Sequence, residues 1–103
     1  MSKTTTSRPH DAAIVEMLRD DPDFASEYLE AAFEEVDQPG GRETLLTALR
    51  RVAEARGMTQ VAKAAGIQRE SLYRALSPKG NPTIKTLLAV MQATGLKLGV
   101  HRG

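Results

Sequence analysis

Residues 58–77 constrain the fold of this 103-residue chain most, because they have the pattern of two short helices joined by a glycine. Gly66 can adopt the positive φ that ends a helix, and Ala62 is small enough for two helices to cross steeply beside it. The apolar stripes on the two sides of the glycine are Val61, Ala62 and Ala65, then Ile67, Leu72, Ala75 and Leu76. This pattern predicts a helix-turn-helix, whose second helix can enter a DNA major groove.

The composition suits a single small globular domain, with 41% hydrophobic and 26% charged residues. There is no cysteine, which excludes a disulfide framework and a thiolate metal site. The amino-terminal residues lack the apolar run of a signal peptide and no window reaches membrane-spanning length, so we expect a cytoplasmic protein without membrane contact. His10 and His101 stand far apart and the carboxylates show no ligand spacing, so we expect no enzyme, no cofactor and no metal.

The formal net charge of +1 conceals a division at Pro39-Gly40-Gly41. Residues 1–38 hold three basic and ten acidic side chains, a charge of −7, whereas residues 39–103 hold eleven basic and three acidic ones, a charge of +8. A basic half suits a phosphate backbone, and an acidic half suits a basic protein partner or a solvated helix. We expect a disordered tail over 1–10, an acidic helical extension over 11–38 and a DNA-binding domain over 42–103.

Two helices are predicted in the acidic half. Asp11 is placed to N-cap a short helix that stops near Asp20, and Asp21 is placed to N-cap a stronger helix from Pro22 to about Val36. The broad apolar face of the second helix either covers the core of the basic half or, together with its glutamates, binds another protein. The candidate residues for protein binding are Phe24, Glu27, Tyr28, Glu30, Glu34 and Glu35.

In the basic half a helix is predicted from Arg42 to Arg56, with Gly57 as its carboxyl-terminal cap and Thr59 as the N-cap of the next helix. Its basic residues either lie over DNA or are solvated; they are Arg50, Arg51 and Arg56.

After a loop over residues 77–82, Asn81 is placed to N-cap a last helix that Gly95 ends. The buried face expected for this helix consists of Ile84, Leu87, Leu88, Val90 and Met91. Leu96–Val100 alternates and predicts a short strand, which either pairs with its copy across a dimer axis or folds back on the core.

Three segments of the chain resemble one known family. They are the Asp-Pro-x-Phe helix start at residues 21–24, the Arg-Glu-Ser-Leu-Tyr-Arg-Ala-Leu helix at 69–76 and the Gly-Asn-Pro-Thr loop at 80–83. Together with the intervening residues, from Ile14 to Val100, they look like the HigA-like addiction-module antidote proteins, a branch of the Xre-type helix-turn-helix group. Many members of the wider group begin the first motif helix with Gln, whereas this chain has Met58-Thr59 and then Gln60.

The resemblance implies an all-α fold of five to six short helices with a lambda-repressor-like helix-turn-helix core, to which the alternation adds the short carboxyl-terminal strand. It also implies a type II antitoxin that binds a toxin of the RelE superfamily, HigB-like, and represses their shared operon. The alternatives are a stand-alone Xre-type repressor and an interaction protein that no longer binds DNA. The −7 charge of residues 1–38 favours the antitoxin, because it would speed the capture of a basic toxin.

The resemblance places one face of the recognition helix toward DNA, namely Gln68, Arg69, Glu70, Ser71, Tyr73 and Arg74. Either arginine can bind a guanine bidentately, while Glu70 either accepts from a cytosine amine or orients Arg74. Phosphate contacts are expected from Lys79, from the backbone amides of Gly80 and Asn81, and from Thr59 or Gln60. One recognition helix buries little surface, so we expect a homodimer on an inverted repeat of operator DNA.

Overall fold

A computed structural model describes residues 7–102, which fold into six helices without a strand. The all-helical class is therefore confirmed for this part of the chain. The helices are α1 (Ser7–Asp20), α2 (Pro22–Glu34), α3 (Gly41–Arg56), α4 (Met58–Ala65), α5 (Arg69–Ala75) and α6 (Ile84–Thr94). Within the described residues, no helix is both long enough and apolar enough to cross a lipid bilayer.

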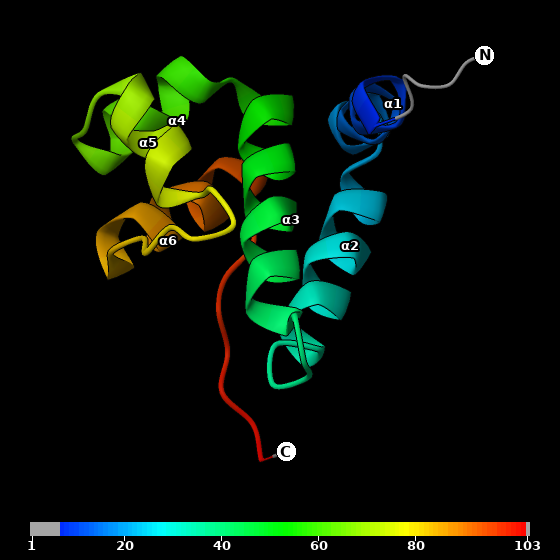
Figure 1. Ribbon diagram of the computed structural model, residues 1–103. Helices are drawn as coiled ribbons and strands as arrows, with labels where there is room; N and C mark the ends of the chain where they lie inside the picture. The colour runs from blue at the N-terminus through cyan, green and yellow to red at the C-terminus, as the bar shows by residue number, and fades with distance from the viewer. Residues whose placement is uncertain (1–6, 103) are drawn as a thin grey trace.

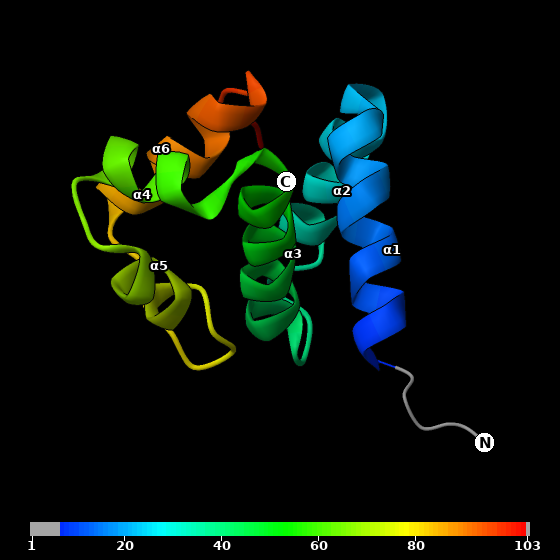
Figure 2. The ribbon, with the colours of Figure 1, turned by 90° about the horizontal axis from the view of Figure 1, so that it is seen from above.

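Helix α3 occupies the centre of the molecule, with α1 and α2 on one side and α4, α5 and α6 on the other (Figures 1 and 2). It contacts α1, α2, α4 and α6. Such a position requires apolar residues on more than one face, and α3 buries Leu46, Ala48, Leu49, Val52, Ala53 and Ala55. The apolar pattern of α3 thus explains how one helix can hold both halves of the chain.

A single hydrophobic core joins the acidic half to the basic half. Every helix contributes at least one large side chain that is less than 2% exposed, and Leu76, directly after α5, adds another. These residues are Leu18, Leu29, Leu49, Val52, Val61, Leu72, Leu76 and Val90. Burying each of them is worth about 1.5–3 kcal/mol. Leu18 and Leu29 come from the acidic half, so α1 and α2 share the core of the basic half, and the division into extension and domain stays a prediction.

The amino-terminal cap of α2 is confirmed. The Asp21 carboxylate accepts hydrogen bonds from the backbone amides of Asp23 and Phe24, at 3.1 and 3.2 Å, and Pro22 occupies the first turn. These bonds satisfy two of the amides that a helix leaves unpaired at its start. The expected caps at Gly57 and Gly95 are confirmed as well, since α3 and α6 end there.

Helix α1 begins earlier than expected. It starts at Ser7, so residues 7–10 of the expected tail are helical, while residues 1–6 lie outside the described part of the chain. Asp11 is therefore not an N-cap but lies one turn inside the helix. Its carboxylate has other partners, because it accepts hydrogen bonds from Arg50 and Arg51 of α3.

Two further expected caps are wrong. Helix α4 begins at Met58, directly after Gly57, so Thr59 lies inside the helix and caps nothing. Helix α6 is capped by Thr83 and not by Asn81: the Thr83 hydroxyl accepts from the amide of Thr86 at 3.1 Å. A side chain caps only the helix start that directly follows it, and both helices start at a different residue from the expected one.

The buried face of α6 is also rotated from the expected one. Ile84 is 71% exposed and Leu88 is 48% exposed, whereas Val90 and Met91 are buried as expected. Residues four apart lie on the same face of a helix, so Ile84 and Leu88 form one apolar stripe on the surface. The core instead receives Thr86, Ala89, Val90 and Met91.

The predicted strand at Leu96–Val100 is wrong, because the chain from Leu96 to residue 102 has no regular secondary structure. A strand needs a second strand to pair its backbone groups, and the described chain contains none. The segment runs away from α6 as an extended tail (Figure 1). Leu98 and Val100 are consequently exposed.

Candidate functional site

Helices α4 and α5 are joined by a three-residue turn in which Gly66 has φ 74°. The amide of Gly66 donates to the Lys63 carbonyl and that of Ile67 to the Ala62 carbonyl, each at 3.0 Å. A side chain at this φ is strained, which explains the glycine. The turn ends α4 within one residue and lets α5 start at Arg69 in a new direction.

Helix α5 is anchored to the core by Leu72 and by Leu76, which follows it directly. Leu72 and Leu76 are both 0% exposed. The residues predicted to face DNA differ in exposure: Gln68, Arg69, Glu70 and Arg74 are exposed, and Ser71 and Tyr73 are half-buried. Four of these six residues are therefore accessible, and we call all six the polar face of α5.

The two arginines of this face contact neutral side chains. The Arg69 guanidinium carbon lies 5.6 Å from the centroid of the Tyr73 ring, within the range of a cation–π interaction. Arg74 donates to the Ser71 hydroxyl at 3.4 Å. Glu70 and Arg74 do not pair among the described residues, so of the two alternatives for Glu70 the intrahelical ion pair is wrong.

The loop after α5 is fixed by its contact with α3. Arg42 donates to the Gly80 carbonyl at 2.9 Å and to the Asn81 side-chain oxygen at 3.3 Å. A Cβ atom on Gly80 would lie 2.1 Å from the Ala75 carbonyl oxygen, so only glycine fits here. The Gly80 amide donates to the Ser77 carbonyl, which contradicts the phosphate contact expected of it. Lys79 and Asn81 are exposed beside it.

The predicted phosphate contacts at the start of α4 lie close to the polar face of α5. Thr59 and Gln60 are exposed, and they line the same groove as Arg69 and Tyr73. The groove has a volume of about 770 Å³. The structure thus brings the start of α4 and the start of α5 together.

The residues predicted to bind a protein separate into two groups on α2. The four carboxylates are exposed: Glu27, Glu30, Glu34 and Glu35. Phe24 and Tyr28 are half-buried against the core, with ring centroids 5.7 Å apart. The glutamates are therefore accessible to a partner, while the aromatic rings mainly hold α2 in place.

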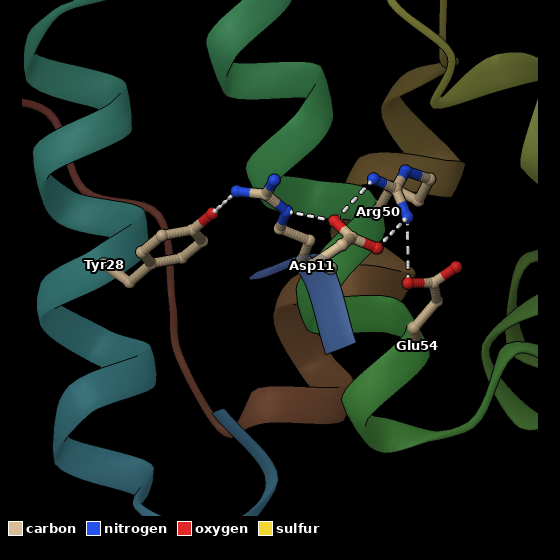
Figure 3. Close-up of polar contacts among 5 residues, drawn as sticks. Asp11, Tyr28, Arg50 and Glu54 are labelled. Carbon is tan, nitrogen blue, oxygen red and sulfur yellow. Dashed lines mark hydrogen bonds and ion pairs between the residues drawn. The ribbon is translucent and has the colours of Figure 1, made fainter. Parts of the chain in front are cut away.

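A polar cluster that the sequence did not reveal joins α1, α2 and α3 (Figure 3). Arg51 donates from Nε to the Asp11 carboxylate at 2.6 Å and from Nη1 to the Tyr28 hydroxyl at 2.9 Å. Arg50 donates to Asp11 at 3.1 Å and to Glu54 at 2.9 Å. We call these five residues the Asp11 clasp.

The clasp settles the role of two arginines. Arg50 and Arg51 are neither over a DNA surface nor solvated, because their side chains are only 25% and 20% exposed and are paired within the chain. Burial of Asp11 works against its ionisation, but the hydrogen bonds and charges of Arg50 and Arg51 outweigh it, so the pKa of Asp11 lies below its ordinary value. No local sequence signal identifies this contact, since the partners are about 40 residues apart in the chain.

The described residues contain no group of three or more histidine and carboxylate side chains placed to hold a metal ion.

Comparison with known proteins agrees with the expected resemblance to addiction-module antidote proteins. A sequence model of the family described as "Probable addiction module antidote protein" matches residues 8–102. An uncharacterized protein of Haemophilus influenzae is 42% identical over 78 residues, which cover 76% of this chain and 80% of that protein. No solved structure matches the chain. Because the family model spans nearly all of the sequence, the chain belongs to the family of probable addiction module antidote proteins.

Proposed function

We propose that this protein is the antitoxin of a type II toxin-antitoxin module, and that it also represses its own operon by binding operator DNA. Membership of an antidote family supports the first part. The exposed polar face of α5 supports the second, because Arg69 and Arg74 are exposed on it and meet only neutral side chains. The function needs no catalysis, and we expect no enzymatic activity.

In the proposed complex the α4–α5 pair acts as the helix-turn-helix, and α5 enters the major groove. Arg69 or Arg74 binds a guanine bidentately, which is worth about 1–3 kcal/mol of discrimination. Glu70 is available to accept from a cytosine amine, since it makes no ion pair in the described chain. Thr59, Gln60, Lys79 and Asn81 are exposed and are assigned to phosphates.

The DNA-bound form is proposed to be a homodimer on an inverted repeat, with half-sites about 34 Å or a multiple apart. The exposed apolar stripe of Ile84 and Leu88 on α6 supports dimerisation, since self-association would cover it. Replacing both residues by Lys is expected to convert the dimer to a monomer in sedimentation equilibrium. Replacing Lys85, which lies between them in sequence and is exposed, by Ala serves as the matched control.

The toxin is proposed to be a basic ribonuclease of the RelE superfamily, HigB-like, bound through the carboxylates of α2. Glu27, Glu30 and Glu34 recur at helical spacing and are all exposed. Complementary charge on a basic partner would raise the rate of association. Phe24 and Tyr28 contribute to this face only through their exposed edges.

The repressor proposal is tested by gel shift on the DNA upstream of the protein's own gene, with a scrambled duplex of equal composition as control. Preferential binding to the upstream DNA at modest salt is expected. Equal binding to both duplexes, or none to either, would refute specific repression.

The antitoxin proposal is tested by co-expression with the product of the neighbouring open reading frame. A small basic protein is expected to co-purify, and the triple variant Glu27→Lys, Glu30→Lys, Glu34→Lys is expected to lose it. Glu43→Lys changes an exposed carboxylate on α3 and is the matched control. Failure of the wild-type chain to retain any such neighbour would remove the antitoxin claim.

A stand-alone Xre-type repressor is the second candidate, and one observation favours it. Leu18 and Leu29 are buried in the common core, so the acidic half is needed for folding whether or not a toxin exists. The two candidates differ in the co-expression experiment, since a stand-alone repressor binds DNA but retains no neighbour.

A further inference from the structure

The groove beside α5 has a second wall that comes from the acidic half of the chain. Figure 2 shows α1 and α5 on opposite sides of α3. Residues of α1, including Glu16 and Arg19, line the same groove as Thr59, Gln60 and Arg69. Arg56, at the end of α3, also lines it. Helix α1 therefore borders the surface that the proposed function assigns to DNA.

The charge of this groove depends on the Asp11 clasp. Its lining includes three carboxylates and three arginines, which are Asp11, Glu16, Glu54, Arg19, Arg56 and Arg69. This set has no net charge. However, Asp11 and Glu54 are already paired with Arg50 and Arg51, which do not line the groove. The unpaired charges that remain in the groove are those of three arginines and one carboxylate, so the groove is basic.

We propose that this groove holds the phosphodiester backbone of duplex DNA, with Arg19 and Arg56 as phosphate contacts. The inference rests on the proposed function, because it assumes that α5 lies in the adjacent major groove. It assigns α1 to the DNA interface although α1 belongs to the acidic half of the chain. The clasp then has a second effect beyond stability, since it neutralises the charge of two carboxylates on a surface that approaches phosphates.

One observation favours DNA over an acidic protein segment as the occupant. Thr59, Gln60 and Arg69, which the proposed function assigns to DNA, line the same groove as Arg19 and Arg56. Arginine suits phosphate and carboxylate alike, because its planar guanidinium can donate two parallel hydrogen bonds to either, so the choice of DNA rests on this shared lining.

The test measures the affinity of the full chain for its upstream DNA and for a scrambled duplex, by fluorescence anisotropy over a series of salt concentrations. Each of the variants Arg19→Ala and Arg56→Ala is expected to weaken binding to the upstream and the scrambled duplex by the same factor. Each should lower the slope of log K against log salt by about 0.9, and the double variant by about 1.8. Glu16→Gln is expected to tighten binding to both duplexes.

The controls are chosen to separate charge from folding. Arg102→Ala removes an exposed arginine outside the groove and should leave the slope unchanged. Arg56→Lys keeps the charge and should keep the slope. Arg19 is exposed, so its single variant is informative even if the loss of Arg56 weakens the last turn of α3.

The outcomes distinguish the inference from the proposed function. If the wild-type chain binds its upstream DNA but the double variant keeps the full salt slope, the groove does not hold a backbone and the repressor proposal survives. If the double variant binds DNA normally but no longer retains the toxin, the groove holds a protein and the inference is overturned. If the wild-type chain binds no DNA, both fail together.

Discussion

The arginines of α3 and those of α5 belong to the same basic half but have opposite surroundings. Arg50 and Arg51 are mostly covered, and their charges are met by carboxylates from α1 and α3. Arg69 and Arg74 are exposed and touch only a tyrosine ring and a hydroxyl. A basic segment therefore predicts a nucleic-acid surface only where its arginines are not paired with carboxylates of the same chain.

The largest effect on stability is expected from removing the side chain that anchors α5 to the core. Leu72→Ala removes a fully buried side chain that anchors α5, and such changes cost about 2–5 kcal/mol. Urea denaturation measures the loss in free energy of unfolding. Ser71→Ala, at a half-buried neighbouring position, is the control and should cost less than about 1 kcal/mol. A loss below about 1 kcal/mol for Leu72→Ala would mean that α5 is not anchored to the core.

The next effect concerns the clasp itself. Asp11→Ala leaves Arg50 and Arg51 without their shared carboxylate, and we expect a loss of about 1–3 kcal/mol. In a chain of this size that loss corresponds to a fall in Tm of roughly 5–20 °C. Glu16→Ala alters an exposed carboxylate of the same helix and should change Tm little. Equal effects of the two substitutions would show that the clasp contributes no more than an exposed charge.

The pH dependence of the clasp gives a third and more gradual test. The pKa of Asp11 lies below its ordinary value of 3.8, so its folded state binds fewer protons than its unfolded state in that region. The stabilisation is therefore complete above pH 3.8 and is lost as the pH falls through the lowered pKa.

The measurement compares the free energy of unfolding of the wild type and Asp11→Asn at several pH values. We expect their difference to be constant near neutral pH and to shrink below about pH 4. A difference that grows on acidification would contradict the proposed pairing.

What could be predicted from the sequence was local. The Asp21-Pro22 start of α2 and the glycine turn at Gly66 are determined by residues next to one another, and both predictions are confirmed. The pattern also identified Leu72 and Leu76 as buried residues correctly, because they lie on the apolar stripe of this segment.

What failed depends on contacts between distant parts of the chain. Asp11 has the chemistry of an N-cap, but its partners on α3 give it another role. Alternation at Leu96–Val100 predicts a strand only if a partner strand exists, and the described chain has none. Ile84 and Leu88 fit a helical stripe equally well on either side of α6, so spacing alone could not tell which stripe faces the core.

The smallest effect on stability is expected for Arg69→Ala, and Arg51→Ala is its counterpart in the other region. Arg69→Ala removes an exposed side chain and should change the free energy of unfolding by less than about 0.5 kcal/mol. If Arg69 binds a guanine, the same change should reduce discrimination between operator and scrambled DNA by about 1–3 kcal/mol. Arg51→Ala should behave in the opposite way, lowering stability while leaving that discrimination intact, because its donors are used by Asp11 and Tyr28.

Both readouts are needed for each variant, since urea denaturation reports on the fold and anisotropy on the two duplexes reports on base recognition. Equal weakening on both duplexes would make Arg69 a phosphate contact, which leaves the contrast between the regions intact and moves base recognition to Arg74. Loss of discrimination in Arg51→Ala at unchanged stability would abolish the contrast, because an arginine paired within the chain would then be reading DNA. The contrast therefore requires that Arg69→Ala loses discrimination between the duplexes and that Arg51→Ala loses stability.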